Sequence, residues 1–123
     1  MINYSTTKAV LVGLAGLLFC MPASAQDNHS STFVTISNIV FYSTGDPVYP
    51  QWAGVTEVIF AQPIAWAAAS SCSTTAVAIR AADKTLVAAV QTALATGRTV
   101  ELFVDDAQAV DSSGVCYLRA VEY

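Results

Sequence analysis

The sequence predicts a β-rich α+β fold with five strands and one helix, the helix lying between the third and fourth strands. Two observations support this prediction. Several short segments are rich in β-branched and aromatic residues, or carry apolar residues at alternate positions, as strands do. One longer segment carries apolar residues at helical spacing, and it separates the third of those segments from the fourth.

The helix is predicted over residues 84–96, a stretch that contains neither Gly nor Pro. Apolar residues recur there at every fourth position and form one stripe: Leu86, Val90 and Leu94. Asp83 precedes this stretch and is a predicted N-cap, because its carboxylate can accept from the free N–H groups of the first turn. Gly97 follows it, where a left-handed residue commonly ends a helix.

The five predicted strands are residues 33–42, 55–60, 75–80, 99–105 and 115–123. In the fourth of them Val100, Leu102 and Val104 fall on one face. Between the strands, residues 26–32 are predicted to fray, residues 43–54 to form the main loop, and residues 106–114 to form a polar turn. Residues 64–69 are ambiguous and are interpreted as a strand rather than a helical turn. This order of elements is that of a five-stranded OB-fold-like barrel; a small α+β sheet with one packed helix is the alternative.

Residues 1–25 have the features of a secretory signal peptide. Lys8 supplies the positive charge, an apolar run follows over residues 9–21, and Ala23-Ser24-Ala25 is a cleavage motif. The run is shorter than the roughly 20 residues that span a bilayer, which disfavours a membrane anchor. We therefore expect cleavage after Ala25, one domain over residues 26–123, a secreted or periplasmic location, and no stable membrane insertion after cleavage.

The net charge of the chain disfavours one class of partner, and its two remaining cysteines are consistent with export. Without Lys8, four Lys or Arg residues face nine Asp or Glu residues, so the net charge of the processed chain is −5. Nucleic acid is therefore not an expected partner, since no basic surface could neutralise phosphates. Cys72 and Cys116 are a pair in an exported chain and are predicted to form one disulfide.

The centre of the chain resembles a known group of proteins. Cys72, a short strand, a helix that ends at Thr96-Gly97, the segment 98–104 and a later cysteine are similar to the B subunits of subtilase-type and typhoid-type AB5 toxins, and to small exported bacterial proteins of the same build. The resemblance implies an OB-fold, a ring of five subunits and glycan binding near the first strand. Those subunits carry an aromatic pair and a serine before that strand, whereas residues 30–32 here lack aromatics, so no glycan-binding residue is transferred.

Catalysis is not expected from this sequence, and neither a cofactor nor a metal is predicted. A catalytic nucleophile needs a base beside it, and the single histidine, His29, lies alone in a segment predicted to be a tail. Asp105, Asp106 and Asp111 could surround calcium, but they lack the glycine and the final glutamate of a known loop. A solvated acidic turn is the favoured interpretation.

The best binding candidates are the aromatic residues in and beside the loop 43–54, namely Tyr42, Tyr49 and Trp52. Aromatic side chains on a loop can stack on a sugar or form a protein interface; alternatively, they only seal one end of the barrel. The leading hypothesis is a non-enzymatic binding domain, B-subunit-like and possible as a pentamer, with a glycan or a protein as ligand. The second hypothesis is a solitary periplasmic domain with a structural or envelope-interaction role and no glycan site.

Overall fold

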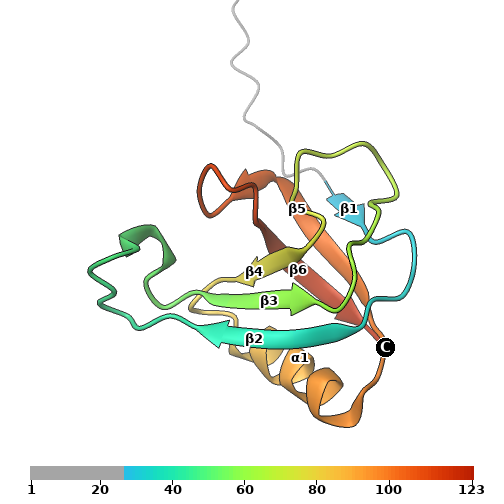
Figure 1. Ribbon diagram of the computed structural model, residues 1–123, viewed down its shortest axis with the longest axis horizontal. Helices are drawn as coiled ribbons and strands as arrows, with labels where there is room; N and C mark the ends of the chain where they lie inside the picture. The colour runs from blue at the N-terminus through green and yellow to red at the C-terminus, as the bar shows by residue number, and fades with distance from the viewer. Residues whose placement is uncertain (1–26) are drawn as a thin grey trace, which may run out of the picture.

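The computed structural model describes residues 27–123, which form one six-stranded sheet and one α-helix (Figure 1). The order of the strands in the sheet is β1-β5-β6-β4-β3-β2. The elements, in chain order, are β1 (Asp27–His29), β2 (Ile36–Phe41), a 3-10 turn η1 (Pro50–Trp52), β3 (Thr56–Phe60), β4 (Ala76–Ile79), α1 (Lys84–Thr96), β5 (Glu101–Ala109) and β6 (Cys116–Glu122). The predicted β-rich fold with one helix is confirmed, but the sheet has six strands in place of five, and the helix lies between the fourth and the fifth of them.

All but one of the strand pairs are antiparallel; β4 and β6 run parallel. The helix α1 makes the crossover between β4 and β5 and packs against β2 and β6 (Figure 1). A bridge between Val34 and Val100 joins the segment between β1 and β2 to the residue just before β5. The two strands at the ends of this strand order, β1 and β2, are consecutive in the chain and are joined by residues 30–35.

Two apolar clusters stabilise the sheet from its two faces. The larger one contains Val77 and Ile79 of β4, Leu102 and Val104 of β5, and Val90 and Ala93 of α1. The smaller one contains Ala76 and Ala78 of the same strand together with Trp52. Strand β4 is therefore buried on both faces, and the small alanine side chains leave room for the indole ring on the second face.

The helix begins and ends at the residues that the sequence predicts, Lys84 and Thr96. Gly97 adopts the left-handed conformation with φ of 66°, and its N–H bonds to the last carbonyls of α1, as predicted. The predicted N-cap is wrong in its mechanism, because the carboxylate of Asp83 makes no capping hydrogen bond. The backbone carbonyl of Asp83 instead accepts from the N–H of Val87 at 3.2 Å.

Three predicted segments need correction. Residues 27–29 are not frayed: they form β1, which pairs with β5. Residues 64–69 are not a strand; they form a loop in which Trp66 makes a bridge with Ser30, the residue that follows β1. Finally, β5 continues to Ala109, so the predicted polar turn is shorter and centres on residues 110–114.

The predicted disulfide between Cys72 and Cys116 is confirmed, with the two Cα atoms 5.5 Å apart. Both residues belong to the larger cluster and are almost fully buried. The bond ties the loop before β4 to the start of β6, and it indicates an oxidising, non-cytoplasmic environment. The predicted signal peptide lies outside the described residues. Within residues 27–123 no helix is long and apolar enough to cross a membrane.

Candidate functional site

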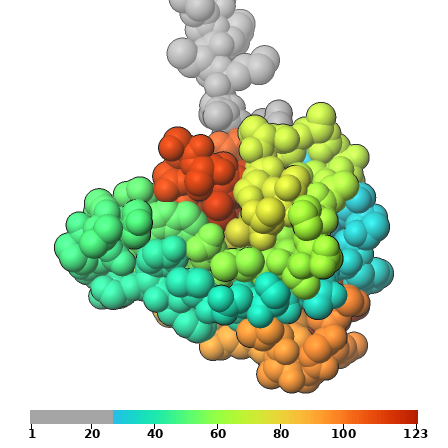
Figure 2. Space-filling model, viewed as in Figure 1, coloured from blue at the N-terminus to red at the C-terminus, as the bar shows by residue number. Residues whose placement is uncertain are grey.

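The loop between β2 and β3, residues 43–54, projects beyond the end of the sheet and is called the arm from here on (Figures 1 and 2). Its backbone is held by local hydrogen bonds. Oδ1 of Asp46 accepts from the N–H groups of Val48 and Tyr49, both at 2.9 Å, and the N–H of Gly45 bonds to Oγ of Ser43. These contacts make a turn of the kind that Asp favours, and the 3-10 turn η1 follows it. The arm is thus an ordered projection.

Trp52 attaches the arm to the body of the domain. Only 6 % of this residue is exposed, and it packs with Val55, Ala76 and Val115 in the smaller cluster. Its indole N–H donates to Oδ2 of Asp111 at 2.8 Å. A ring in this position is not free to stack on a ligand, so the role of Trp52 is to hold the arm in place.

Tyr42 lies beside Trp52, with the two ring centroids 5.0 Å apart and the planes tilted by 37°. Its hydroxyl donates to Oε2 of Glu57 at 3.1 Å. Burial, followed by the hydrogen bond and charge of Glu57, raises the pKa of Tyr42 above its ordinary value. Tyr42 is half-buried, so its ring supports Trp52 on one side and reaches the surface on the other.

Tyr49 is the predicted site residue that faces solvent, with 52 % of its surface exposed. Two apolar residues that sequence reasoning missed are also exposed in this region: Val48 at 70 % and Phe41, at the end of β2, at 57 %. The sequence feature that could have identified Val48 and Phe41 is their apolar character in and beside a loop that contains two prolines. The structure therefore divides the three predicted aromatics into a buried anchor, a half-buried support and an exposed contact residue.

Asp111 connects the arm to the turn between β5 and β6. Besides Trp52, its carboxylate accepts from Nε2 of Gln51 at 3.4 Å and from both the backbone N–H and the hydroxyl of Ser113. The bonds from Ser113 and Trp52 lower the pKa of Asp111 to about 2. The arm and the turn 110–114 are consequently held as one unit by an ionised carboxylate.

Asp111→Asn is expected to lower stability at neutral pH and to remove part of the acid sensitivity. A carboxyl group whose folded pKa is about 2 stabilises the fold above its unfolded value near 3.8, and this contribution is lost as the pH falls through the folded pKa. The wild type should therefore lose its advantage over the variant between about pH 4 and pH 2. Urea unfolding at pH 7, 4 and 2.5 measures this difference. Asp83→Asn is the matched control, because that carboxylate makes no capping bond. If wild type and Asp111→Asn lose the same free energy of unfolding as the pH falls, the stabilising role assigned to the Asp111 carboxylate would be wrong.

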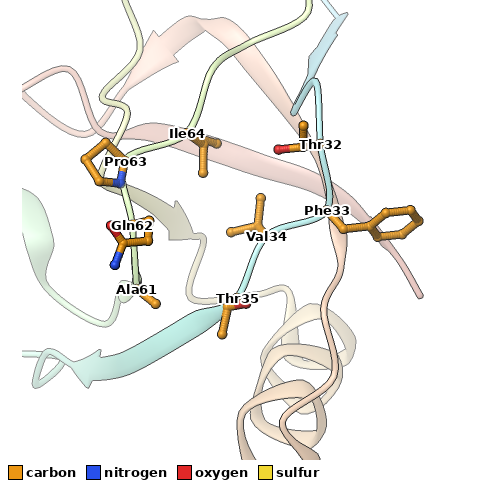
Figure 3. Close-up of a pocket in the computed structure, with 8 residues that line it drawn as sticks. All are labelled: Thr32, Phe33, Val34, Thr35, Ala61, Gln62, Pro63 and Ile64. Carbon is orange, nitrogen blue, oxygen red and sulfur yellow. The ribbon is translucent and has the colours of Figure 1, made fainter.

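A second feature is a surface groove of about 250 Å³ between residues 32–35 and 61–64 (Figure 3). The two segments are joined by hydrogen bonds from Ser31 N to Ala65 O and from Ala61 N to Thr35 O, and they separate between these bonds. Val34 and Ile64 form its apolar centre, whereas the ring of Phe33 points away from it (Figure 3). Sequence reasoning did not predict this groove, which depends on the separation of two backbone segments rather than on any residue pattern.

Of the remaining chemical candidates, His29 and Asp105 are engaged in local contacts. Nδ1 of His29 lies 2.9 Å from Oε1 of Glu101 and 3.1 Å from the carbonyl of Ser30, and its ring stacks on Phe103. Asp105 is buried and accepts from the N–H of Ala107 at 3.1 Å. Among residues 27–123 no group of three or more His, Cys, Asp or Glu side chains could hold a metal ion.

Comparisons with known proteins add no assignment: no protein-family model, no curated protein and no solved structure matches this chain. The similarity to AB5 toxin B subunits therefore stays a prediction.

Proposed function

We propose that this chain is a non-enzymatic, exported binding domain with an OB-like barrel, secreted or periplasmic after cleavage behind Ala25. The strand pairing supports the barrel. Residues 27–41 can be described as one bent strand whose first part pairs with β5 and whose second part pairs with β3. The bridge at Val34 lies at the bend. Counting this segment as one strand gives five strands, with a helix between the third and the fourth.

The arm together with the turn 110–114 is the proposed binding surface. In OB-folds, the loop between the first two strands and the loop between the last two contribute to ligand binding, and in the proposed count these are the arm and the turn. The observation that carries the proposal is the hydrogen bond between Trp52 and Asp111, which holds the two together. Preorganisation of this kind lowers the entropy lost on binding.

The exposed residues of the arm favour a protein ligand. Val48 and Tyr49 present an aliphatic and an aromatic side chain at the end of a fixed projection, and Tyr is among the residues that dominate the energy of protein interfaces. The acidic charge of the domain disfavours nucleic acid. A catalytic subunit, as the resemblance to AB5 toxins implies, is one partner of this kind.

A glycan is the second candidate ligand, and the groove is the feature that favours it. Thr32 and Gln62 supply a hydroxyl and an amide beside the apolar centre formed by Val34 and Ile64. Sugars are bound by such combinations of apolar surface and a few polar groups. If neither surface binds a ligand, the domain is a solitary periplasmic one with a structural or envelope-interaction role.

Crosslinking in the compartment where the protein resides tests the proposed surface. We expect the partner captured by the wild type to be lost with Tyr49→Ala and retained with Phe33→Ala, a control that removes an exposed aromatic ring elsewhere. Loss of the partner in Phe33→Ala alone would place the binding surface away from the arm. Glycan-array binding that is abolished by Gln62→Ala would instead support the groove.

A homopentamer is proposed with the B-subunit-like function, because exposed apolar side chains lie on different parts of the molecule. Leu94 lies on α1, whereas Phe41 lies at the end of β2. Contacts between unlike surfaces of identical subunits generate rings when the rotation closes. We expect a native mass near five times that of the processed chain by light scattering. A monomeric mass at micromolar concentration would exclude the ring and favour the solitary domain.

A further inference from the structure

One guanidinium group is held in a fixed position without a carboxylate beside it. Arg80 follows β4, and its guanidinium carbon lies 4.1 Å from the ring centroid of Tyr117 on β6. Its Nη2 donates to Oε1 of Gln108 on β5 at 2.6 Å. The ion pairs among residues 27–123 are made by Arg119 and His29 and do not include Arg80. The stack and the hydrogen bond therefore orient a permanent positive charge that has no acidic partner in the described part of the chain.

These two contacts use only part of the binding capacity of Arg80. A guanidinium group is planar and carries five N–H donors that lie in its plane. Stacking on Tyr117 covers one face of the plane and uses none of the donors, and Gln108 accepts from a single N–H. The side chain is half-buried, so the remaining donors can be reached from solvent. A carboxylate matches such a fork of donors, because its two oxygens can accept two parallel hydrogen bonds.

Two carboxylates on nearby strands have other donors. Glu57 on β3 accepts from the hydroxyl of Tyr42 at 3.1 Å. Asp105 on β5 is buried and accepts from the N–H of Ala107 at 3.1 Å. Their charges, and the net charge of −5 of the processed chain, disfavour a ligand with many negative charges. A group with a single negative charge, such as one carboxylate, fits this surface better than a phosphate-rich ligand.

Arg80 lies beside the base of the arm. The next residue of the chain, Ala81, contacts the last residue of the arm: a Cβ built on Gly54 would lie 3.1 Å from the Cβ of Ala81. Tyr117, on which Arg80 stacks, packs against the smaller cluster, and this cluster also contains Trp52 of the arm. The positive charge is therefore next to the surface that we assign to a protein partner.

We propose that Arg80 is the carboxylate-binding residue of this surface and pairs with an Asp or Glu side chain of the protein partner. Tyr117 and Gln108 are positioning residues, because they fix the plane of the guanidinium before binding and so lower the entropy that binding costs. The apolar contact at Tyr49 supplies contact area, whereas the ion pair selects a partner with an acidic side chain at a matching place. This inference rests on the proposed protein-binding function.

Acetyl-aspartyl-amide is a probe that tests the carboxylate site without the partner. The Nε–Hε resonances of Arg80 and Arg98 are followed by NMR in the purified protein as the probe is added. Arg98 is the internal control, because it also lies over a tyrosine ring, that of Tyr123 at 5.0 Å, but is exposed. We expect saturable binding at Arg80, with a dissociation constant about fivefold lower than at Arg98. The neutral acetyl-asparaginyl-amide should shift neither resonance.

Three results of this titration would overturn the proposal: no saturable shift at Arg80, equal dissociation constants at the two arginines, or equal shifts with the neutral probe. Tighter binding of inorganic phosphate than of acetyl-aspartyl-amide would also overturn it, because the site would then prefer a phosphate group. Gln108 is exposed, so Gln108→Ala is expected to fold. This variant should weaken binding of the probe at Arg80 about threefold, because the guanidinium loses one of its two fixed contacts.

Crosslinking separates failure of this inference from failure of the proposed function. Arg80→Gln is expected to lose the partner that the wild type captures, as Tyr49→Ala does, whereas Arg98→Gln should retain it. Capture that depends on Tyr49 but not on Arg80 would overturn the inference and leave the proposed function intact. Saturable binding of the probe at Arg80, with capture that Tyr49→Ala does not affect, would support the carboxylate site and reject the arm as the contact surface.

Discussion

Replacement of both Cys72 and Cys116 by alanine is expected to lower the free energy of unfolding by about 4 kcal/mol. The two residues are separated by 44 positions, and on the chain-entropy model a crosslink of that span restricts the unfolded chain by about this amount. The loss is a large part of the roughly 5–15 kcal/mol that stabilises a domain. Urea unfolding of the oxidised wild type and the double variant measures it.

Reduction supplies the matched control for this prediction. The wild type in reductant and the double alanine variant should unfold at similar urea concentrations, because both lack the crosslink. Cys116 also contributes to the larger apolar cluster, so a small difference between the two is expected from packing. If the double variant keeps the stability of the oxidised wild type, the disulfide would have no role in the stability of the fold.

The elements with strong periodicity were predictable from the sequence. The helix and the alternation of residues 100–104 were predictable because one side of each element is buried; Val100, Leu102 and Val104 are all fully buried. The predicted stripe of α1 is only partly correct, because Val90 is buried together with Ala93 whereas Leu94 is exposed. Gly97 was predictable for a different reason, since a left-handed residue is tolerated best by glycine. In both cases the cause of the structure is local in the sequence.

Strand β1 was not predictable in this way because its buried side chain is polar. Asn28 is 2 % exposed, and its amide bonds to both the N–H and the C=O of Ala68, 40 residues away. A periodicity of apolar residues cannot reveal a strand that is held by such long-range hydrogen bonds. Residues 64–69 were misassigned for the same reason, since their backbone is held by the bonds from Ala67 N to His29 O and from Ser31 N to Ala65 O, which join segments more than 30 positions apart.

The candidate site was predictable in its location but not in the roles of its residues. Tyr42, Tyr49 and Trp52 were grouped because aromatic residues cluster around one loop. Their exposure depends on what the rest of the chain places against them: Ala76 and Ala78 leave space for Trp52, and Asp111 bonds to its indole N–H. These partners are more than 20 positions from Trp52 in the sequence, and no local pattern of residues predicts them.

Trp52→Ala and Tyr49→Ala should separate stability from binding on the arm. Trp52→Ala is expected to lower the free energy of unfolding by about 3–5 kcal/mol, because it opens a cavity in the smaller cluster and leaves Asp111 without its indole donor. Tyr49→Ala changes an exposed side chain and should alter the free energy of unfolding by no more than about 0.5 kcal/mol. Urea unfolding at pH 7 compares the two variants with the wild type.

The same pair of variants distinguishes a contact residue from a residue that positions others. If the arm binds its ligand through Tyr49, Tyr49→Ala abolishes binding while the domain stays folded. Trp52→Phe, which keeps an aromatic ring in the cluster but removes the indole N–H, should weaken binding only through looser attachment of the arm to the turn 110–114. Equal affinity of Tyr49→Ala and wild type would remove Tyr49 from the site, and a stable Trp52→Ala protein would mean that the arm is not anchored by its indole ring.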